Sequence, residues 1–172
     1  MCVLEITPVI ATERLMLRGV VANDAQRLCD LANDLMVARM TRSLPHPYGM
    51  ADAETWLERT VVSGETAFVI EHRLEGMVGL LSFDPSPRRE IGYFIGRRYW
   101  NQGYATEAVQ GALAWLARQG QRMAAAGHFS DNPASGIVLC KAGFLYTGEV
   151  QLRPSIARSG DLVPTRMMVW LA

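Results

Sequence analysis

A short polar segment ahead of an amphipathic stretch could bind an anion. It reads YWNQGYATEA, residues 99–108, and follows an alternating apolar run. A helix that begins after Gly103 leaves several backbone N–H groups of its first turn without partners inside the helix. With the positive end of the helix dipole, those groups form a site for phosphate or pyrophosphate, and glycine permits close approach. Arg97 and Arg98 lie just upstream and could add charge-assisted contacts. An ordinary strand-to-helix turn with a surface arginine pair has the same pattern.

Two common phosphate-binding motifs are excluded by spacing. The chain has no GxxxxGK[ST], which excludes a P-loop, and no GxGxxG after a first strand, which argues against a Rossmann dinucleotide site. Any anion must therefore be held by the turn at Gly103 itself.

Composition describes an ordinary globular protein. Of 172 residues, 49% are hydrophobic and 20% are charged, and 17 basic residues balance 17 acidic ones. A net charge of zero gives no global field that favours nucleic acid or an anionic membrane. The cysteines are Cys2, Cys29 and Cys140; they form no CxxC pair, so we expect free thiols and no metal site. The N-terminus lacks the pattern of a signal peptide, and we expect a cytoplasmic protein.

The elements that must position the turn follow from periodicity. Residues 104–116 place apolar side chains at helical spacing, and Asn132, Pro133 and Gly143 suit the cap, first turn and end of a shorter helix. The order of strands and helices predicts an α+β fold. Helices are predicted over 23–35, 51–62, 104–116 and 132–143, and strands over 14–20, 66–72, 77–83, 89–95, 122–130, 144–152 and 165–171.

Several blocks in this order resemble the GNAT superfamily of acyl-CoA-dependent N-acetyltransferases, in particular its ribosomal-protein alanine N-acetyltransferase (RimJ/RimL) branch. They are TERLMLR (12–18), LPHPYGMADAETWL (44–57), IGYFIGRRYWNQGYATEAV (91–109) and DNPASGIVLCKAGF (131–144). The resemblance covers nearly the whole chain and implies one GNAT domain over residues 1–172. It also implies a mixed, mostly antiparallel sheet of six to seven strands, flanked by about four helices and splayed between its fourth and fifth strands.

The resemblance assigns a coenzyme A site to the central segment. In the family motif Q/R-x-x-G-x-G/A, Gly103 and Ala105 match, whereas Trp100 replaces the first residue and Asn101 stands where the branch often has glycine. Near the end of the preceding strand, a backbone N–H at Phe94 or Ile95 would polarise the thioester carbonyl. The pyrophosphate would be held by the backbone amides of Gln102, Gly103, Tyr104, Ala105 and Thr106.

Asn132 and Ser135 carry over from the NPAS block as residues beside the coenzyme. Ser135 would hydrogen-bond or protonate the departing thiolate. A serine near a helix cap can instead bond locally. Both interpretations stay open at this point.

Acetyl transfer also requires an uncharged amine, and the sequence offers few proton acceptors. Glu90 could act through water or could pair with Arg88 and Arg89. His128, near the end of the strand before NPAS, titrates in the right range, and so does His46, although each can equally be structural. Some relatives place a glutamate near Arg153-Pro154, where this chain has no carboxylate.

We therefore expect an enzyme that moves an acetyl group from acetyl-CoA to a primary amine by direct attack in a ternary complex, without a metal. A protein or peptide N-terminus is the expected acceptor. The alternatives are a small amine, such as an amino sugar, polyamine or drug, and a non-catalytic acyl-CoA-binding domain. Segments 36–50 and 152–164 would wall the acceptor cleft, the latter as a mobile loop. A homodimer is possible by resemblance; no nucleic acid or membrane partner is expected.

Overall fold

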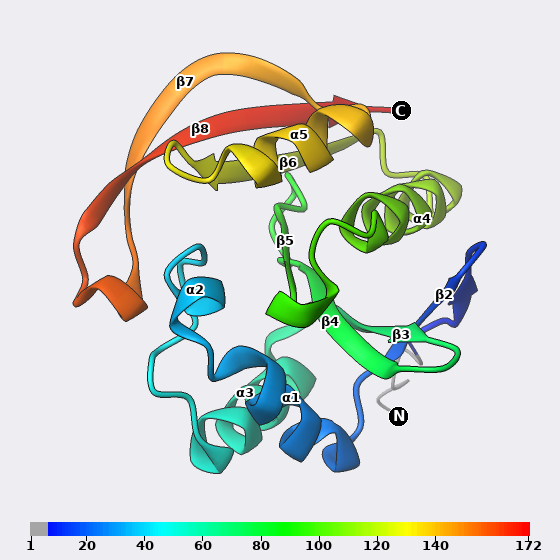
Figure 1. Cartoon of the computed structure of the whole chain (residues 1–172). Coiled ribbons are helices and arrows are strands. Elements are labelled where there is room, and N and C mark those ends of the chain that lie inside the picture. The colour runs from blue at the N-terminus through cyan, green and yellow to red at the C-terminus, as the bar shows by residue number, and fades with distance from the viewer. Residues whose placement is uncertain (1–6) are drawn as a thin grey trace.

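The computed structural model describes residues 7–172 and contains one sheet with helices on both faces (Figure 1). Within that range the strands are β1 (Ile10–Ala11), β2 (Leu15–Gly19), β3 (Thr66–His72), β4 (Gly76–Phe83), β5 (Ile91–Ile95), β6 (Met123–Phe129), β7 (Leu145–Pro154) and β8 (Leu162–Leu171). The helices are α1 (Ala25–Ala32), α2 (Leu35–Ala38), α3 (Met50–Ser63), α4 (Tyr104–Arg118) and α5 (Pro133–Lys141). Short 3-10 turns are η1 (Ala22–Asp24), η2 (Arg97–Tyr99) and η3 (Ile156–Arg158).

The predicted α+β fold is confirmed, with two added elements. The two-residue β1 and the four-residue α2 are too short for periodicity to reveal. The strands follow the order β1-β2-β3-β4-β5-β6-β8-β7, and every neighbouring pair is antiparallel except β5 and β6. The sheet is therefore mixed and mostly antiparallel, as expected.

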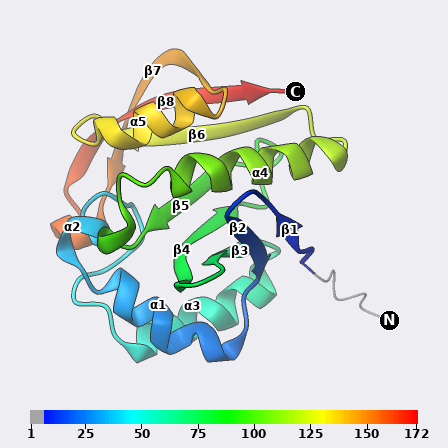
Figure 2. The ribbon, with the colours of Figure 1, turned by 45° about the vertical axis from the view of Figure 1, so that its right-hand side comes forward.

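The sheet divides at its one parallel pair. β5 pairs with β4 along its whole length, from Ile91 to Ile95, but it pairs with β6 only at Ile91 and Ala126. Beyond that point the two strands diverge, and the predicted splay between the fourth and fifth predicted strands lies here. Figure 2 shows the two halves of the sheet, with β2 to β5 below, β6 to β8 above, and α4 in front of the division.

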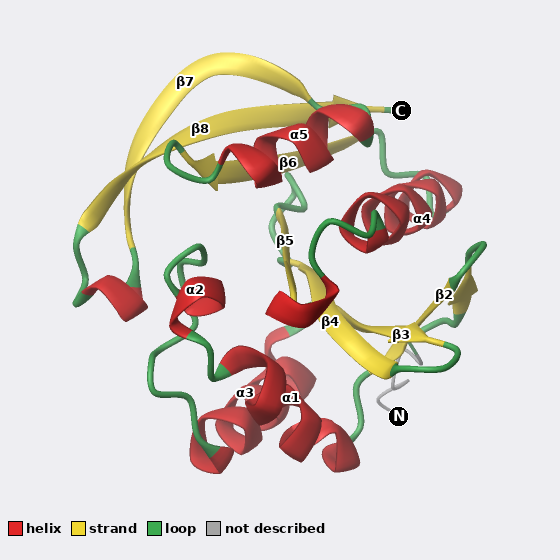
Figure 3. Ribbon diagram, viewed as in Figure 1, coloured by secondary structure: helices red, strands yellow, loops and turns green. Residues whose placement is uncertain are grey.

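Helices cover both faces of the sheet. α4 and α5 pack on one face, and α1 and α3 pack together on the other (Figure 3). The predicted apolar stripe of α4 is buried at Ala108, Val109, Ala112, Leu113 and Leu116. In β3 the run 67–70 is buried without interruption, because neither face of that strand meets water. Among residues 7–172 we find no helix that combines the length and the apolar character needed to span a membrane.

Segment 152–164 is built more regularly than the predicted loop. It contains the end of β7, η3 and the beginning of β8. Ser155 is fully buried, and its hydroxyl donates to the carbonyl of Thr41 at 3.0 Å, while the Ile156 amide donates to the carbonyl of Arg42 at 3.1 Å. The tip of the β7–β8 hairpin is thereby joined to the segment after α2, and the two predicted cleft walls touch.

Candidate active site

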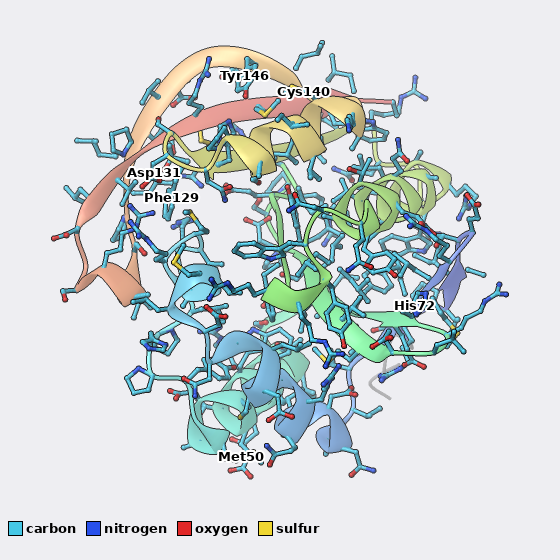
Figure 4. All side chains as sticks on the ribbon, in the orientation of Figure 1. Met50, His72, Phe129, Asp131, Cys140 and Tyr146 are labelled. Atoms are coloured by element: carbon cyan, nitrogen blue, oxygen red, sulfur yellow. The ribbon has the colours of Figure 1, made fainter. Side chains whose placement is uncertain are left out.

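A cleft of about 1280 Å³ opens where β5 and β6 diverge. Its walls come from segments 36–45, β5, the first turn of α4, the end of β6 and the beginning of α5. Figure 4 labels Phe129 and Asp131, which line it at the end of β6. The sequence-predicted site residues that line it are Glu90, Phe94, Ile95, Gly103, Tyr104, Ala105, Thr106, His128, Asn132 and Ser135.

The strand β5 directs the backbone groups of its odd-numbered residues toward this cleft, where the Trp100 indole donates to the Ile95 carbonyl at 2.7 Å. At its two ends, Gly96 donates to the carbonyl of Val78 and the Glu90 carbonyl accepts from Asp84, so even-numbered residues face β4. Because successive residues of an antiparallel strand point their amides to opposite sides, Tyr93 and Ile95 direct theirs toward the gap. Of the two amides considered for the thioester, that of Ile95 thus faces the cleft, and that of Phe94 faces β4.

The turn before α4 contains two residues in the left-handed region. Asn101 has φ +59° and Gly103 has φ +80°. Asparagine tolerates the left-handed conformation better than most residues. This explains why Asn101 can stand where the RimJ/RimL branch, by resemblance, often has glycine. Gly103 makes no side-chain cap, so the first-turn amides of α4 are directed into the cleft at the positive end of a 15-residue helix.

The side chain of Arg14 binds the turn before α4, and no pattern in the sequence indicated this contact. Its Nη1 donates to the Gln102 carbonyl at 2.8 Å, its Nε donates to Glu107 Oε2 at 2.7 Å, and its guanidinium lies 4.8 Å from the centre of the Tyr104 ring. Glu107 also accepts from the Thr12 hydroxyl at 2.6 Å and from the Arg14 amide at 2.7 Å. Burial raises the pKa of Glu107, but these hydrogen bonds outweigh it and hold its pKa below the ordinary value.

A Glu107→Gln variant is expected to lower the free energy of unfolding by roughly 1.5 kcal/mol near neutral pH, as for hydrogen bonds to a charged acceptor. The folded-state pKa is depressed, so this stabilisation is present above the unfolded pKa of about 4.3 and is lost as pH falls through the folded value. Urea unfolding near pH 7 and near pH 3 should therefore show the two proteins converging in acid. Glu58→Gln, at an exposed position of α3, serves as the control. A difference that does not shrink in acid would contradict this role.

The two consecutive arginines upstream of the turn, Arg97 and Arg98, do not point into the cleft. Arg97 Nη1 lies 3.8 Å from Asp34 Oδ2, and Arg98 Nη2 lies 3.5 Å from Glu75 Oε2. Neither residue lines the cleft, nor does Gln102. The structure thus brings the backbone of the turn to the cleft without bringing the two guanidinium groups.

Asn132 and Ser135 lie across the cleft from β5. The side chain of Asn132 caps α5 by accepting from the Ser135 amide at 3.2 Å, as its position before Pro133 predicts. The Ser135 hydroxyl does not make this local bond. It lies 2.8 Å from the hydroxyl of Tyr93, which reaches over from β5. Alternation along β5 puts residues 91, 93 and 95 on one face, a pattern that could have indicated Tyr93.

Glu90 is paired, but not with its neighbours in sequence. Its two oxygens accept from Nη1 and Nη2 of Arg153, the second at 3.2 Å, and Arg42 Nη1 lies 3.9 Å away. The expected pairing with Arg88 and Arg89 is not what the structure shows. Arg153 reaches Glu90 past Gly127, which has no side chain to block the path.

The two histidines differ in their surroundings. His128 is 5% exposed, and its Nδ1 lies 2.9 Å from the Phe129 carbonyl while its Nε2 lies 2.9 Å from the Tyr146 hydroxyl. Its ring is covered by Gly136 of α5. His46 belongs to the α2–α3 loop, next to Pro45 of the cleft wall. Both ring nitrogens of His128 thus lie within hydrogen-bond distance of other groups of the chain.

An open strand edge beside an anion-binding helix start suits a ligand with a peptide-like arm and a phosphate group. The sequence matches the family model described as "Acetyltransferase (GNAT) domain" over residues 14–145. The chain belongs to the GNAT family of acetyltransferases. This GNAT enzyme is 28% identical over 158 residues to the uncharacterized N-acetyltransferase YoaA of Bacillus subtilis, covering 82% of this chain and 85% of YoaA.

Solved structures of the family share the fold. A RimL ribosomal L7/L12 α-N-protein acetyltransferase in complex with coenzyme A superposes with a TM-score of 0.82 at 18% identity, covering 95% of this chain and 98% of that one. A spermidine N-acetyltransferase from Vibrio cholerae, in complex with CoA and spermine, gives a TM-score of 0.77 at 18% identity, covering 92% and 95%. The fold is thus shared by enzymes with protein and small-amine acceptors.

Proposed function

We propose that this GNAT enzyme transfers the acetyl group of acetyl-CoA to the amine of a protein or peptide N-terminus. The observation that carries the proposal is the gap between β5 and β6 beside the first turn of α4. The pantetheine arm would pair with the open edge of β5, with its thioester carbonyl at the Ile95 amide. The backbone amides of Gly103 to Thr106, which line the cleft, would hold the pyrophosphate. The RimL and spermidine enzymes, which share this fold, were solved in complex with coenzyme A, and this supports a coenzyme A site in this chain.

Two of the carboxylates that line the cleft are already paired with arginines. Spermidine carries several cations and needs carboxylates to hold them. Asp131 is paired with Arg158 at 2.8 Å, an interaction that lowers the pKa of the carboxyl, and Glu90 is paired with Arg153. A polycation would have to break these two ion pairs. Asp52, Glu65 and Asp84 also line the cleft and form no ion pair among residues 7–172, so a polyamine stays the alternative acceptor.

The amine would attack the thioester directly, because neither Cys29 nor Cys140 is placed to form an acyl-enzyme in the main cleft. Cys29 is buried, and Cys140 lies in a separate small cavity of about 330 Å³ behind α5, beside Tyr146 (Figure 4). Neither thiol lines the main cleft. The nitrogen lone pair would attack the carbonyl carbon, the C–S electron pair would leave with sulfur, and Ser135 would hydrogen-bond the departing thiolate. Because the oxygens of Glu90 and the ring nitrogens of His128 are engaged, we assign the amine proton to water.

The test is release of the CoA thiol from acetyl-CoA with a panel of amines. Peptides with free N-termini are expected to support turnover, and mass spectrometry should place one acetyl group on the α-amine. The same peptides with a blocked N-terminus serve as controls and should be inert. Faster turnover with spermidine or an amino sugar than with any peptide would overturn the acceptor assignment. Coenzyme binding without turnover on any amine would overturn the proposed reaction.

A further inference from the structure

A pair of hydroxyl groups bridges the two sides of the cleft. Tyr93 Oη lies 2.8 Å from Ser135 Oγ and 3.3 Å from the Ser135 carbonyl oxygen, to which it can donate. Tyr93 belongs to β5 and Ser135 to α5, and both line the cleft. The bridge therefore crosses the region where the thioester would lie.

The surroundings of Tyr93 keep its hydroxyl protonated. Burial raises the pKa of Tyr93 to about 12, although the hydrogen bond to Ser135 acts in the opposite direction. At any pH suited to acetyl transfer the phenol thus carries its proton and can act as a donor. Within residues 7–172, its recorded partners are the hydroxyl and carbonyl of Ser135.

A serine hydroxyl by itself has no fixed direction. It rotates freely, and near a helix start it can turn back to a local backbone acceptor. The amide of Ser135 is already held by Asn132, which fixes the backbone but not Oγ. The phenol has one proton and two acceptors on Ser135, and the contact with Oγ, at 2.8 Å, is shorter than that with the carbonyl, at 3.3 Å. If the phenol proton is given to Oγ, the Ser135 proton must point away from Tyr93.

We propose that Tyr93 is a positioning residue that donates to Ser135 Oγ and thereby turns the Ser135 proton toward the sulfur of acetyl-CoA. This inference rests on the proposed function. As the amine nitrogen bonds to the carbonyl carbon and the C–S bond breaks, the electron pair goes to sulfur and Ser135 hydrogen-bonds the thiolate. The amine loses one proton and the thiolate gains one, so the products are the amide and free CoA. Tyr93 keeps its own proton throughout.

The test is a double-mutant cycle between Tyr93→Phe and Ser135→Ala. In the wild-type background, Tyr93→Phe should lower kcat by about tenfold, the order expected for one hydrogen bond that matters in the transition state, with KM for acetyl-CoA unchanged. In the Ser135→Ala background, the same substitution should have no further effect, because the group it orients is gone. Effects that multiply would overturn the inference, since a structural role lowers both backgrounds alike.

The control is Thr60→Val, which removes a buried hydroxyl of α3 that donates to the Trp56 carbonyl at 2.9 Å and does not line the cleft, and which should leave kcat unchanged. Thermal unfolding and CoA affinity establish that each variant is folded. A wild-type chain that acetylates no amine would refute the proposed function. An active wild-type chain with an equally active Tyr93→Phe variant would refute only the positioning role. A large loss in Tyr93→Phe with none in Ser135→Ala would also refute it, because Tyr93 would then act without Ser135.

Discussion

A Gly103→Val variant is expected to bind CoA about 10- to 100-fold more weakly than the wild-type chain, or roughly 1.4 to 2.8 kcal/mol. Gly103 has φ +80°, a conformation that a β-branched residue adopts only at a cost, so the turn would move and redirect the amides that follow. An added Cβ would also lie 3.2 Å from Arg14 Nη2, in the contact that holds the turn. Isothermal titration of CoA measures the affinity.

The other end of the same helix offers a matched control. Gly120 follows α4 with φ +82°, and an added Cβ would meet no atom within 4 Å. Gly120→Val should therefore introduce comparable backbone strain and lose comparable stability while CoA affinity stays unchanged. Equal affinities in both variants and in the wild-type chain would contradict the pyrophosphate assignment. Equal losses in both would show that strain alone, and not the ligand contact, accounts for the effect.

A Gly79→Ala variant is expected to lower kcat by about 100-fold, the loss that a displacement of about 1 Å at a reacting centre can cause. Gly79 of β4 lies opposite Ile95 of β5. An added Cβ would overlap the carbonyl oxygen of Phe94 and lie 2.8 Å from Ile95 Cδ1 and 3.1 Å from Ile95 Cα. Since most of these atoms are backbone, β5 would have to shift. It would shift toward the gap, where its backbone pairing with β6 is limited to Ile91 and Ala126 among residues 7–172, and would carry the Ile95 amide with it. The Trp100 indole, which donates to the Ile95 carbonyl at 2.7 Å, would have to follow.

Steady-state kinetics and thermal unfolding of this variant separate its two effects. Overpacking of this kind also costs about 1–3 kcal/mol of stability. Gly92→Ala is the control for stability alone, because Gly92 belongs to β5 itself and an added Cβ would meet nothing within 4 Å. It should unfold at the wild-type temperature. A Gly79→Ala variant with wild-type kcat would show that the position of β5 does not control the reaction.

Local features of the chain were predictable because neighbouring residues decide them. The cap of α5 by Asn132, the left-handed Gly143 and the buried stripe of α4 all follow from residues a few positions apart. The glycine turn before α4 belongs to the same class. The register of β5, by contrast, depends on β4, and therefore the choice between the Phe94 and Ile95 amides needed the sheet.

The chemistry of the cleft depends on contacts between distant parts of the chain. Glu90 follows two arginines, yet its partner is Arg153, 63 residues away. Sequence proximity favoured Arg88 and Arg89, but β6 and β8 lie between β5 and β7, and the long side chain of Arg153 crosses past Gly127 of β6 to reach Glu90. His128 looked available as a base, but α5 and Tyr146 cover it. No local pattern indicates how helices and strands stack over a side chain.

The sequence by itself indicated the family, through the resemblance of four ordered blocks to known enzymes. Periodicity and short motifs determined the order of the longer elements and the turn where a helix begins behind Gly103. Only the tertiary structure decided which groups meet across the cleft. Tyr93 reaches Ser135, 42 residues away, and Arg14 reaches Glu107, 93 residues away. The first pair forms because α5 packs beside β5 across the cleft, and the second because α4 packs on β1 and β2. Their geometry is a property of the packed chain, and no short segment of it carries that information.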